Sequence, residues 1–82
     1  MNSASRTPKQ LGTELRRYRK KSGLTQADLS NRIGKRQATI SNLEVEGSGA
    51  LETLFAVLSA LDLELAVRPR SKGESVKLGD IF

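Results

Sequence analysis

The segment from residue 23 to residue 44 constrains the fold most, because it carries two helix starts in close succession. Thr25 can cap a helix whose third position is Asp28, where an acid favours the positive N-terminal end. Gly34 then supplies a turn, and a second helical stretch follows over residues 36–44. The segment therefore predicts two short helices joined by a glycine turn. The residues expected to point inward from them are Leu29, Ile33, Ile40 and Leu43.

A longer helix is predicted before this pair. Thr7 is its cap, Pro8 takes the first helical position where a missing N–H costs nothing, and Gln10 is placed for a capping box. Gly23 ends the helix, because glycine tolerates a positive φ. The apolar stripe of this helix consists of Leu11, Leu15 and Tyr18.

A fourth helix is predicted after the break at residues 47–49, with Ser48 or Gly49 preceding it. Its apolar face comprises Leu51, Leu54, Leu58 and Leu61, broadened by Phe55 and Val57. The helical residues 7–62 therefore form one small all-α domain of four helices. With 82 residues, the chain has room for a single packed core.

The period changes from helical to alternating at residues 63–68. Leu63, Leu65 and Val67 alternate with more polar neighbours, as in a half-buried strand. A lone strand leaves its backbone groups unpaired, so we expect it to pair antiparallel with the same strand of a second subunit across a two-fold axis. The alternative is an extended tail that docks on its own domain.

Residues 1–6 and 69–82 are predicted to be flexible, because both stretches are largely polar. The second stretch ends with apolar groups that could dock in a groove of a partner protein, although an unstructured end is the alternative. These residues are Val76, Leu78, Ile81 and Phe82.

Positive charge is concentrated at the start of the chain. Ten Lys and Arg oppose two acids through residue 36, whereas residues 37–67 hold five acids and no base. Residues 1–36 therefore carry a formal charge of +8 in a chain whose net charge is +5, so the basic side chains cluster at the entry to the predicted helix pair, where a polyanion could lie.

Composition also excludes several classes of protein. The chain has no Cys and no His, which excludes disulfides, cysteine nucleophiles, imidazole chemistry and metal sites built from thiolate or imidazole ligands. No glycine-rich phosphate loop or activated nucleophile is evident, so we expect neither an enzyme nor a bound cofactor. No apolar run is long enough to span a membrane, and we expect a soluble, cytoplasmic protein.

The second helix of the pair has the division of residues that reading DNA requires. Small or hydrogen-bonding side chains open it, and apolar ones lie on its opposite face, so its exposed side suits a major groove about 12 Å wide. Arginine can bond guanine, glutamine can pair with adenine, and alanine admits a thymine methyl. The predicted base contacts are Arg36, Gln37, Ala38, Ser41 and Asn42.

Phosphate contacts are expected around the N-terminus of the first helix of the pair, where free backbone N–H groups attract an anion. Nearby basic and hydroxyl side chains can assist. The predicted phosphate contacts are Thr25, Gln26, Arg32, Lys35 and Thr39.

Residues 10–63 resemble the phage-repressor and Cro family, also called XRE-like, which has a small four-helix, lambda-repressor-like fold. The resemblance is carried by Leu15-Arg16 with Arg19, by Gly23-Leu24-Thr25-Gln26-Ala27-Asp28-Leu29, by Ile33-Gly34, by Thr39-Ile40-Ser41 and by Leu43-Glu44. It implies a structural ion pair between Arg19, near the end of the first helix, and Glu44, near the end of the recognition helix.

Within that family, residues 34–42 and the strand after the fourth helix resemble HipB-type antitoxins. The resemblance implies a homodimer that binds a palindromic operator in its own promoter and holds a HipA-like serine/threonine kinase toxin. A plain XRE-family regulator without a toxin partner is the alternative interpretation.

Overall fold

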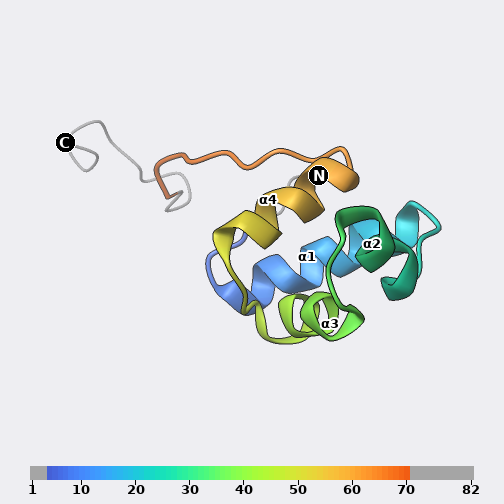
Figure 1. Ribbon diagram of the computed structural model, residues 1–82. Coiled ribbons are helices and arrows are strands. Elements are labelled where there is room, and N and C mark those ends of the chain that lie inside the picture. Colours follow the sequence, from blue (N-terminus) through green and yellow to red (C-terminus); the bar gives the residue numbers. More distant parts are fainter. Residues whose placement is uncertain (1–3, 71–82) are drawn as a thin grey trace, which may run out of the picture.

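The computed structural model describes residues 4–70, which contain four helices and no strand (Figure 1). The helices are α1 (Pro8–Lys21), α2 (Gln26–Ile33), α3 (Gln37–Glu46) and α4 (Leu51–Ala60). α3 packs against both α1 and α2, and α4 packs against α2. The predicted all-α, four-helix domain is therefore confirmed. None of the described helices is both long enough and apolar enough to cross a membrane.

The ends of α1 follow local signals. The Thr7 hydroxyl accepts a hydrogen bond from the Gln10 N–H at 3.1 Å, which confirms the predicted cap. The Gln10 side chain accepts from the Arg6 N–H at 2.7 Å instead of completing the reciprocal box with Thr7. At the other end Gly23 has φ +76°, and its N–H and that of Leu24 bond back to the last turn, as in a Schellman motif.

α2 begins with a complete capping box. The Thr25 hydroxyl accepts from the Asp28 N–H at 3.0 Å, and the Asp28 carboxylate accepts from the Thr25 N–H at 2.9 Å. Gly34, with φ +68°, ends α2 in the left-handed conformation that a side chain would strain. Both predicted ends of α2 are therefore confirmed. α3 runs two residues further than predicted, to Glu46, because Gly47 rather than Glu44 terminates it.

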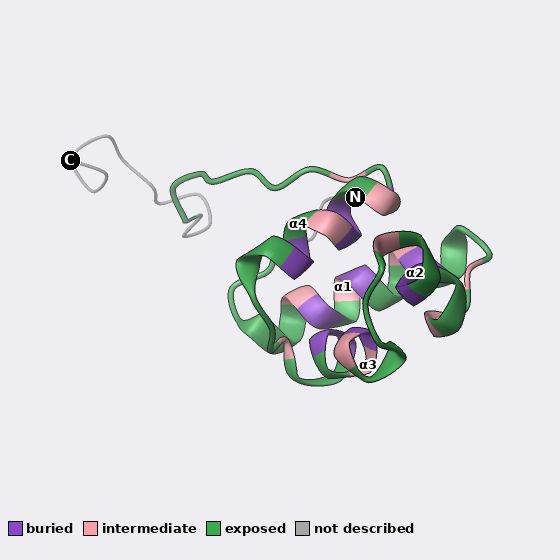
Figure 2. Cartoon of the chain, in the orientation of Figure 1, coloured by how far each residue is buried: buried purple, intermediate pink, exposed green. Residues whose placement is uncertain are grey.

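The core lies between the helices, with the buried residues of the bundle turned toward one another (Figure 2). It consists of Leu15, Leu29, Ile40, Leu43, Leu54, Val57, Leu58 and Leu61. The predicted apolar face of α4 is wrong at two positions, because Leu51 is 71% exposed and Phe55 is 52% exposed. The buried face of α4 instead includes Thr53. α4 therefore carries more apolar side chains than the other helices of the domain cover, which leaves Leu51 and Phe55 exposed.

α1 and α3 approach most closely at Gly12. A Cβ atom added there would overlap the backbone carbonyl oxygens of Leu43 and Glu44. The missing side chain therefore allows the backbones of the two helices to touch.

Residues 63–70 leave α4 as an extended segment, most of which is exposed (Figure 2). Leu63 packs partly on the core, whereas Leu65 is 46% exposed and Val67 is 94% exposed. A single chain supplies no second strand to pair with, so the strand at 63–68 stays a prediction. The predicted docking residues Val76, Leu78, Ile81 and Phe82 lie outside the described residues.

Candidate DNA-binding surface

A buried ion pair holds α3 against α1. Arg19 Nε lies 2.6 Å from Glu44 Oε2, and Arg19 Nη2 donates to Glu44 Oε1 at 3.1 Å. Arg19 is 6% exposed and Glu44 is 4% exposed. Arg19 Nη1 also donates to the Leu24 carbonyl at 2.7 Å, which fixes the loop that precedes α2. One guanidinium therefore sets the positions of α1, the α2 entry and α3 together.

Gln26 belongs to the same network. Its Nε2 donates to Glu44 Oε1 at 3.1 Å, and its side chain is partly buried. The sequence predicts a phosphate contact for this side chain, and in the structure Glu44 engages one of the two N–H donors of its amide. No local pattern could reveal this bond, because the two residues are 18 positions apart in the sequence.

The opposite side of α3 is exposed to solvent. Gln37, Ala38 and Asn42 are exposed, and Ser41 is half-buried beside them. Arg36 is the N-cap residue of α3, and its exposed side chain makes no capping bond. These five predicted base contacts therefore gather on and just before the first two turns of α3. The polar side chains among them have donors and acceptors that match those of base edges in the major groove, and the Ala38 methyl group matches the thymine methyl.

Val45 lies on the same side of α3 and was not among the predicted contacts. It is 56% exposed and follows Ser41 by four residues, which is about one helical turn. Val45 therefore extends the exposed side of α3 by one turn beyond Ser41.

The predicted phosphate contacts Thr25 and Arg32 are exposed, and Thr39 is half-buried. The hydrogen bond from the Thr25 N–H is the largest cause that lowers the pKa of the Asp28 carboxyl. The nearby positive charge of Arg32 lowers this pKa further, as a smaller cause. Because the capping box engages the N–H groups of Thr25 and Asp28, those of Gln26 and Ala27 are the first-turn donors left for an anion.

Lys35, the remaining predicted phosphate contact, follows the turn between α2 and α3. Its Nζ lies 4.0 Å from Glu52 Oε1, and both side chains are substantially exposed. An ion pair of this kind contributes little and is screened by salt. Lys35 can therefore exchange Glu52 for a phosphate.

Among the described residues, no cluster of acids could hold a metal ion.

Comparison with known proteins agrees with this geometry. The chain matches the helix-turn-helix family over residues 15–67. It is 37% identical over 62 residues to the antitoxin HipB of Escherichia coli K12, a match that covers 74% of this chain and 70% of that protein. The HipB of Escherichia coli O6:H1 is equally similar, with 66% of its length covered. Both relatives are antitoxins.

Solved structures show the same fold. A chain of the "Structure of HipA-HipB-O2-O3 complex" superposes with a TM-score of 0.78 at 32% identity, covering 85% of this chain and 100% of that chain. A chain of the "HipB-O4 20mer complex" gives the same values. The chain therefore belongs to the XRE-type helix-turn-helix family, and within that family it is a HipB-like protein.

Proposed function

We propose that the chain is a transcriptional repressor that binds double-stranded DNA sequence-specifically. We also propose that it is the antitoxin of a HipA-like serine/threonine kinase toxin. It acts in the cytoplasm and represses its own operon through a palindromic operator. The observation that carries the proposal is the exposed, hydrogen-bonding side of α3, held in place by the buried Arg19–Glu44 pair. The complexes of similar chains with 20mers and with HipA support it.

In this proposal Arg36 and the start of α3 read bases, and Lys35, in the turn before them, contacts the DNA backbone. Gln37 pairs with adenine, Arg36 bonds guanine, and Ala38 contacts a thymine methyl, with Ser41 and Asn42 one turn further along. Each good bidentate pair discriminates by about 1–3 kcal/mol against the wrong base.

Footprinting of the DNA upstream of the gene, with the wild type and two variants, tests this assignment. Gln37→Ala should relax sequence preference at one position of each half-site, because it removes a bidentate base contact. Lys35→Ala should weaken binding to all sequences about equally and lower the salt dependence, because it removes a phosphate contact. The opposite pattern would show that base reader and phosphate contact are interchanged.

We also propose that residues 63–68 pair with the same segment of a second copy. Two α3 helices would then lie about 34 Å apart, which suits half-sites one helical turn apart. Val67→Ser should shift the protein toward monomer in analytical ultracentrifugation, and it should not affect folding because Val67 is 94% exposed in the monomer. Ala66→Ser, on the other face of the predicted strand, is the matched control. A wild type that sediments as a monomer at micromolar concentration would contradict the pairing.

The toxin is the second proposed partner. Its proposed contacts are the apolar residues near the end of the chain, Val76, Leu78, Ile81 and Phe82. Co-purification with the product of an adjacent HipA-like kinase gene tests this, and deletion of residues 70–82 should weaken the complex. Operator binding by a chain that never retains the kinase would instead indicate a plain repressor.

A further inference from the structure

The charged residues of α1 fall on two different faces of the helix. At about 100° per residue, Arg17 and Lys21 share one face, and Lys9, Arg16 and Lys20 share another that is rotated by roughly 100°. The two faces carry the same kind of charge in different surroundings.

The face of Arg17 and Lys21 is satisfied within the helix. Arg17 Nη2 lies 2.7 Å from Glu14 Oε1, and the Arg17 guanidinium lies 4.7 Å from the centre of the Tyr18 ring. The Lys21 ammonium lies 5.7 Å from the same ring. An acid and an aromatic face therefore already compensate these two cations.

The face of Lys9, Arg16 and Lys20 has no such compensation. All three residues are exposed, and none takes part in an ion pair among residues 4–70. Lys20 lies in the last turn, where the helix dipole favours a cation, but Lys9 lies in the first turn, where the dipole opposes one. That turn contains no acid. Helix stability alone therefore does not account for this row of cations.

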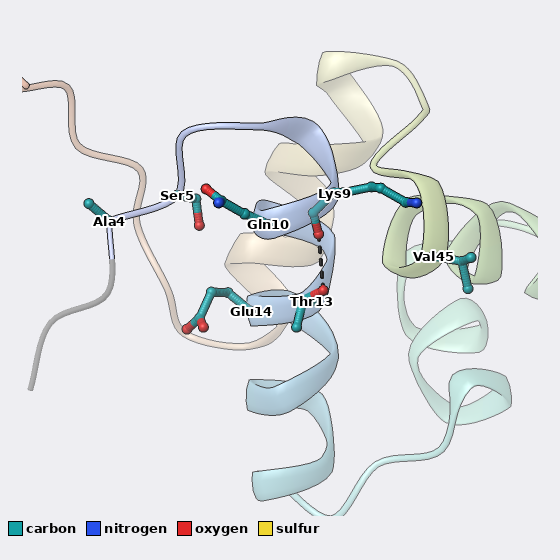
Figure 3. A pocket seen from close by; sticks show the side chains of 7 residues that line it. All are labelled: Ala4, Ser5, Lys9, Gln10, Thr13, Glu14 and Val45. Atoms are coloured by element: carbon teal, nitrogen blue, oxygen red, sulfur yellow. Dashed lines mark hydrogen bonds between the residues drawn. The ribbon is translucent and has the colours of Figure 1, made fainter.

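The row lies beside the groove-facing side of α3. Gly12 marks the line of contact between α1 and α3, and the three cations are all rotated from Gly12 by about 40–80° in the direction away from Leu15 and the core. Lys9 and Val45 of α3 line the same pocket near the start of α1, so Lys9 lies close to the exposed side of α3. Figure 3 shows the Lys9 side chain extending from α1 toward the helix that carries Val45.

The dimensions of DNA fit this arrangement. The rims of a major groove roughly 12 Å wide lie about 6 Å from a helix centred in it. The axis of a helix packed against that helix lies about 8–10 Å away. The row from Lys9 to Lys20 extends about 16 Å at 1.5 Å per residue, which is several base-pair steps of 3.4 Å.

We propose that Lys9, Arg16 and Lys20 form a second row of phosphate contacts along the groove rim next to α1, in addition to the contacts around α2. The inference rests on the proposed DNA binding of α3. Such contacts are independent of sequence, hold α3 in register, and leave Arg17 and Lys21 with no part in binding.

A pair of matched double variants tests the proposal. Arg16→Gln/Lys20→Gln and Arg17→Gln/Lys21→Gln each remove one Arg and one Lys, four residues apart, from the same helix. Binding of the full chain to a random-sequence 20-base-pair duplex is measured by fluorescence anisotropy over a range of salt concentrations, and circular dichroism verifies that each variant is folded. The random duplex is suitable because phosphate contacts do not depend on the operator.

The first variant should make the negative slope of log K against log salt shallower by about 1.8 per protomer, at about 0.9 per lost contact, and the second should leave the slope near that of the wild type. Equal slopes for the two variants would overturn the proposed row and leave the proposed function standing. A wild type without salt-dependent binding to any duplex, the operator region included, would overturn both.

Discussion

Removal of the Glu44 carboxylate tests whether the buried ion pair sets the stability of the domain. In Glu44→Ala, Arg19 would keep only its 2.7 Å bond to the Leu24 carbonyl and would lose both bonds to Glu44. The guanidinium would remain 6% exposed, unless the structure opened to let in water. Gln26 would lose its acceptor as well, but its side chain is only partly buried and water can replace the bond.

The expected loss of stability is large compared with the whole. Leaving one partner of a buried ion pair uncompensated costs about 3–5 kcal/mol. At about 0.05–0.15 kcal/mol per residue, a chain of 82 residues has about 4–12 kcal/mol in total. The variant should therefore melt roughly 12–40 °C lower than the wild type, at about 4–8 °C per kcal/mol for a domain of this size.

Urea unfolding followed by circular dichroism measures this loss, and a double-mutant cycle identifies its origin. The double variant Arg19→Met/Glu44→Leu removes both charges and fills the space with apolar groups, so it should be close to the wild type in stability. At a temperature where Glu44→Ala is still folded, its DNA sequence preference should be unchanged, since the exposed face of α3 is intact. A loss below about 1 kcal/mol in Glu44→Ala, or a double variant as unstable as the sum of Arg19→Met alone and Glu44→Leu alone, would refute the reasoning.

Three further outcomes follow from the described contacts. Gly12→Ala should destabilise the domain by about 1–3 kcal/mol in urea unfolding, because its Cβ would overlap the α3 backbone, whereas helix propensity alone would favour Ala by about 1 kcal/mol. At neutral pH, Asp28→Asn should unfold at a lower midpoint concentration of urea than the wild type. The difference in stability between the wild type and Asp28→Asn should narrow as the pH falls through the acid range, because the pKa of Asp28 is lowered in the folded protein. The ionised carboxylate stabilises the fold above the ordinary pKa of Asp, and this stabilisation is lost as the pH falls through the pKa of the folded state. A gap that does not change with pH would contradict this role of the capping box with Thr25. Glu52→Gln should tighten binding to duplexes of any sequence in anisotropy titrations, because it frees Lys35 from the 4.0 Å pair; unchanged affinity would show that Glu52 does not compete with phosphate.

The helix ends could be read from the sequence because their causes lie within a few residues. Two helix starts are capped by threonine hydroxyls, which bond to backbone N–H groups three positions away, at Thr7 and Thr25. Two helix ends follow from a positive φ that glycine tolerates and from backbone bonds to the last turn, at Gly23 and Gly34. The exposure of Gln37 at the start of α3 followed in the same way, from the helical spacing of Ile40 and Leu43.

Packing decided what lies across the chain. Whether Phe55 faced the core or solvent depended on how much of α4 the other helices cover, and the bond from Gln26 to Glu44 depended on how α2 and α3 cross. The division of the α1 cations into two faces became informative only when Gly12 showed which face adjoins α3. Local sequence determined where each helix begins and ends, because those bonds are short in sequence. Only the tertiary structure decided which faces meet, because burial depends on residues far apart along the chain.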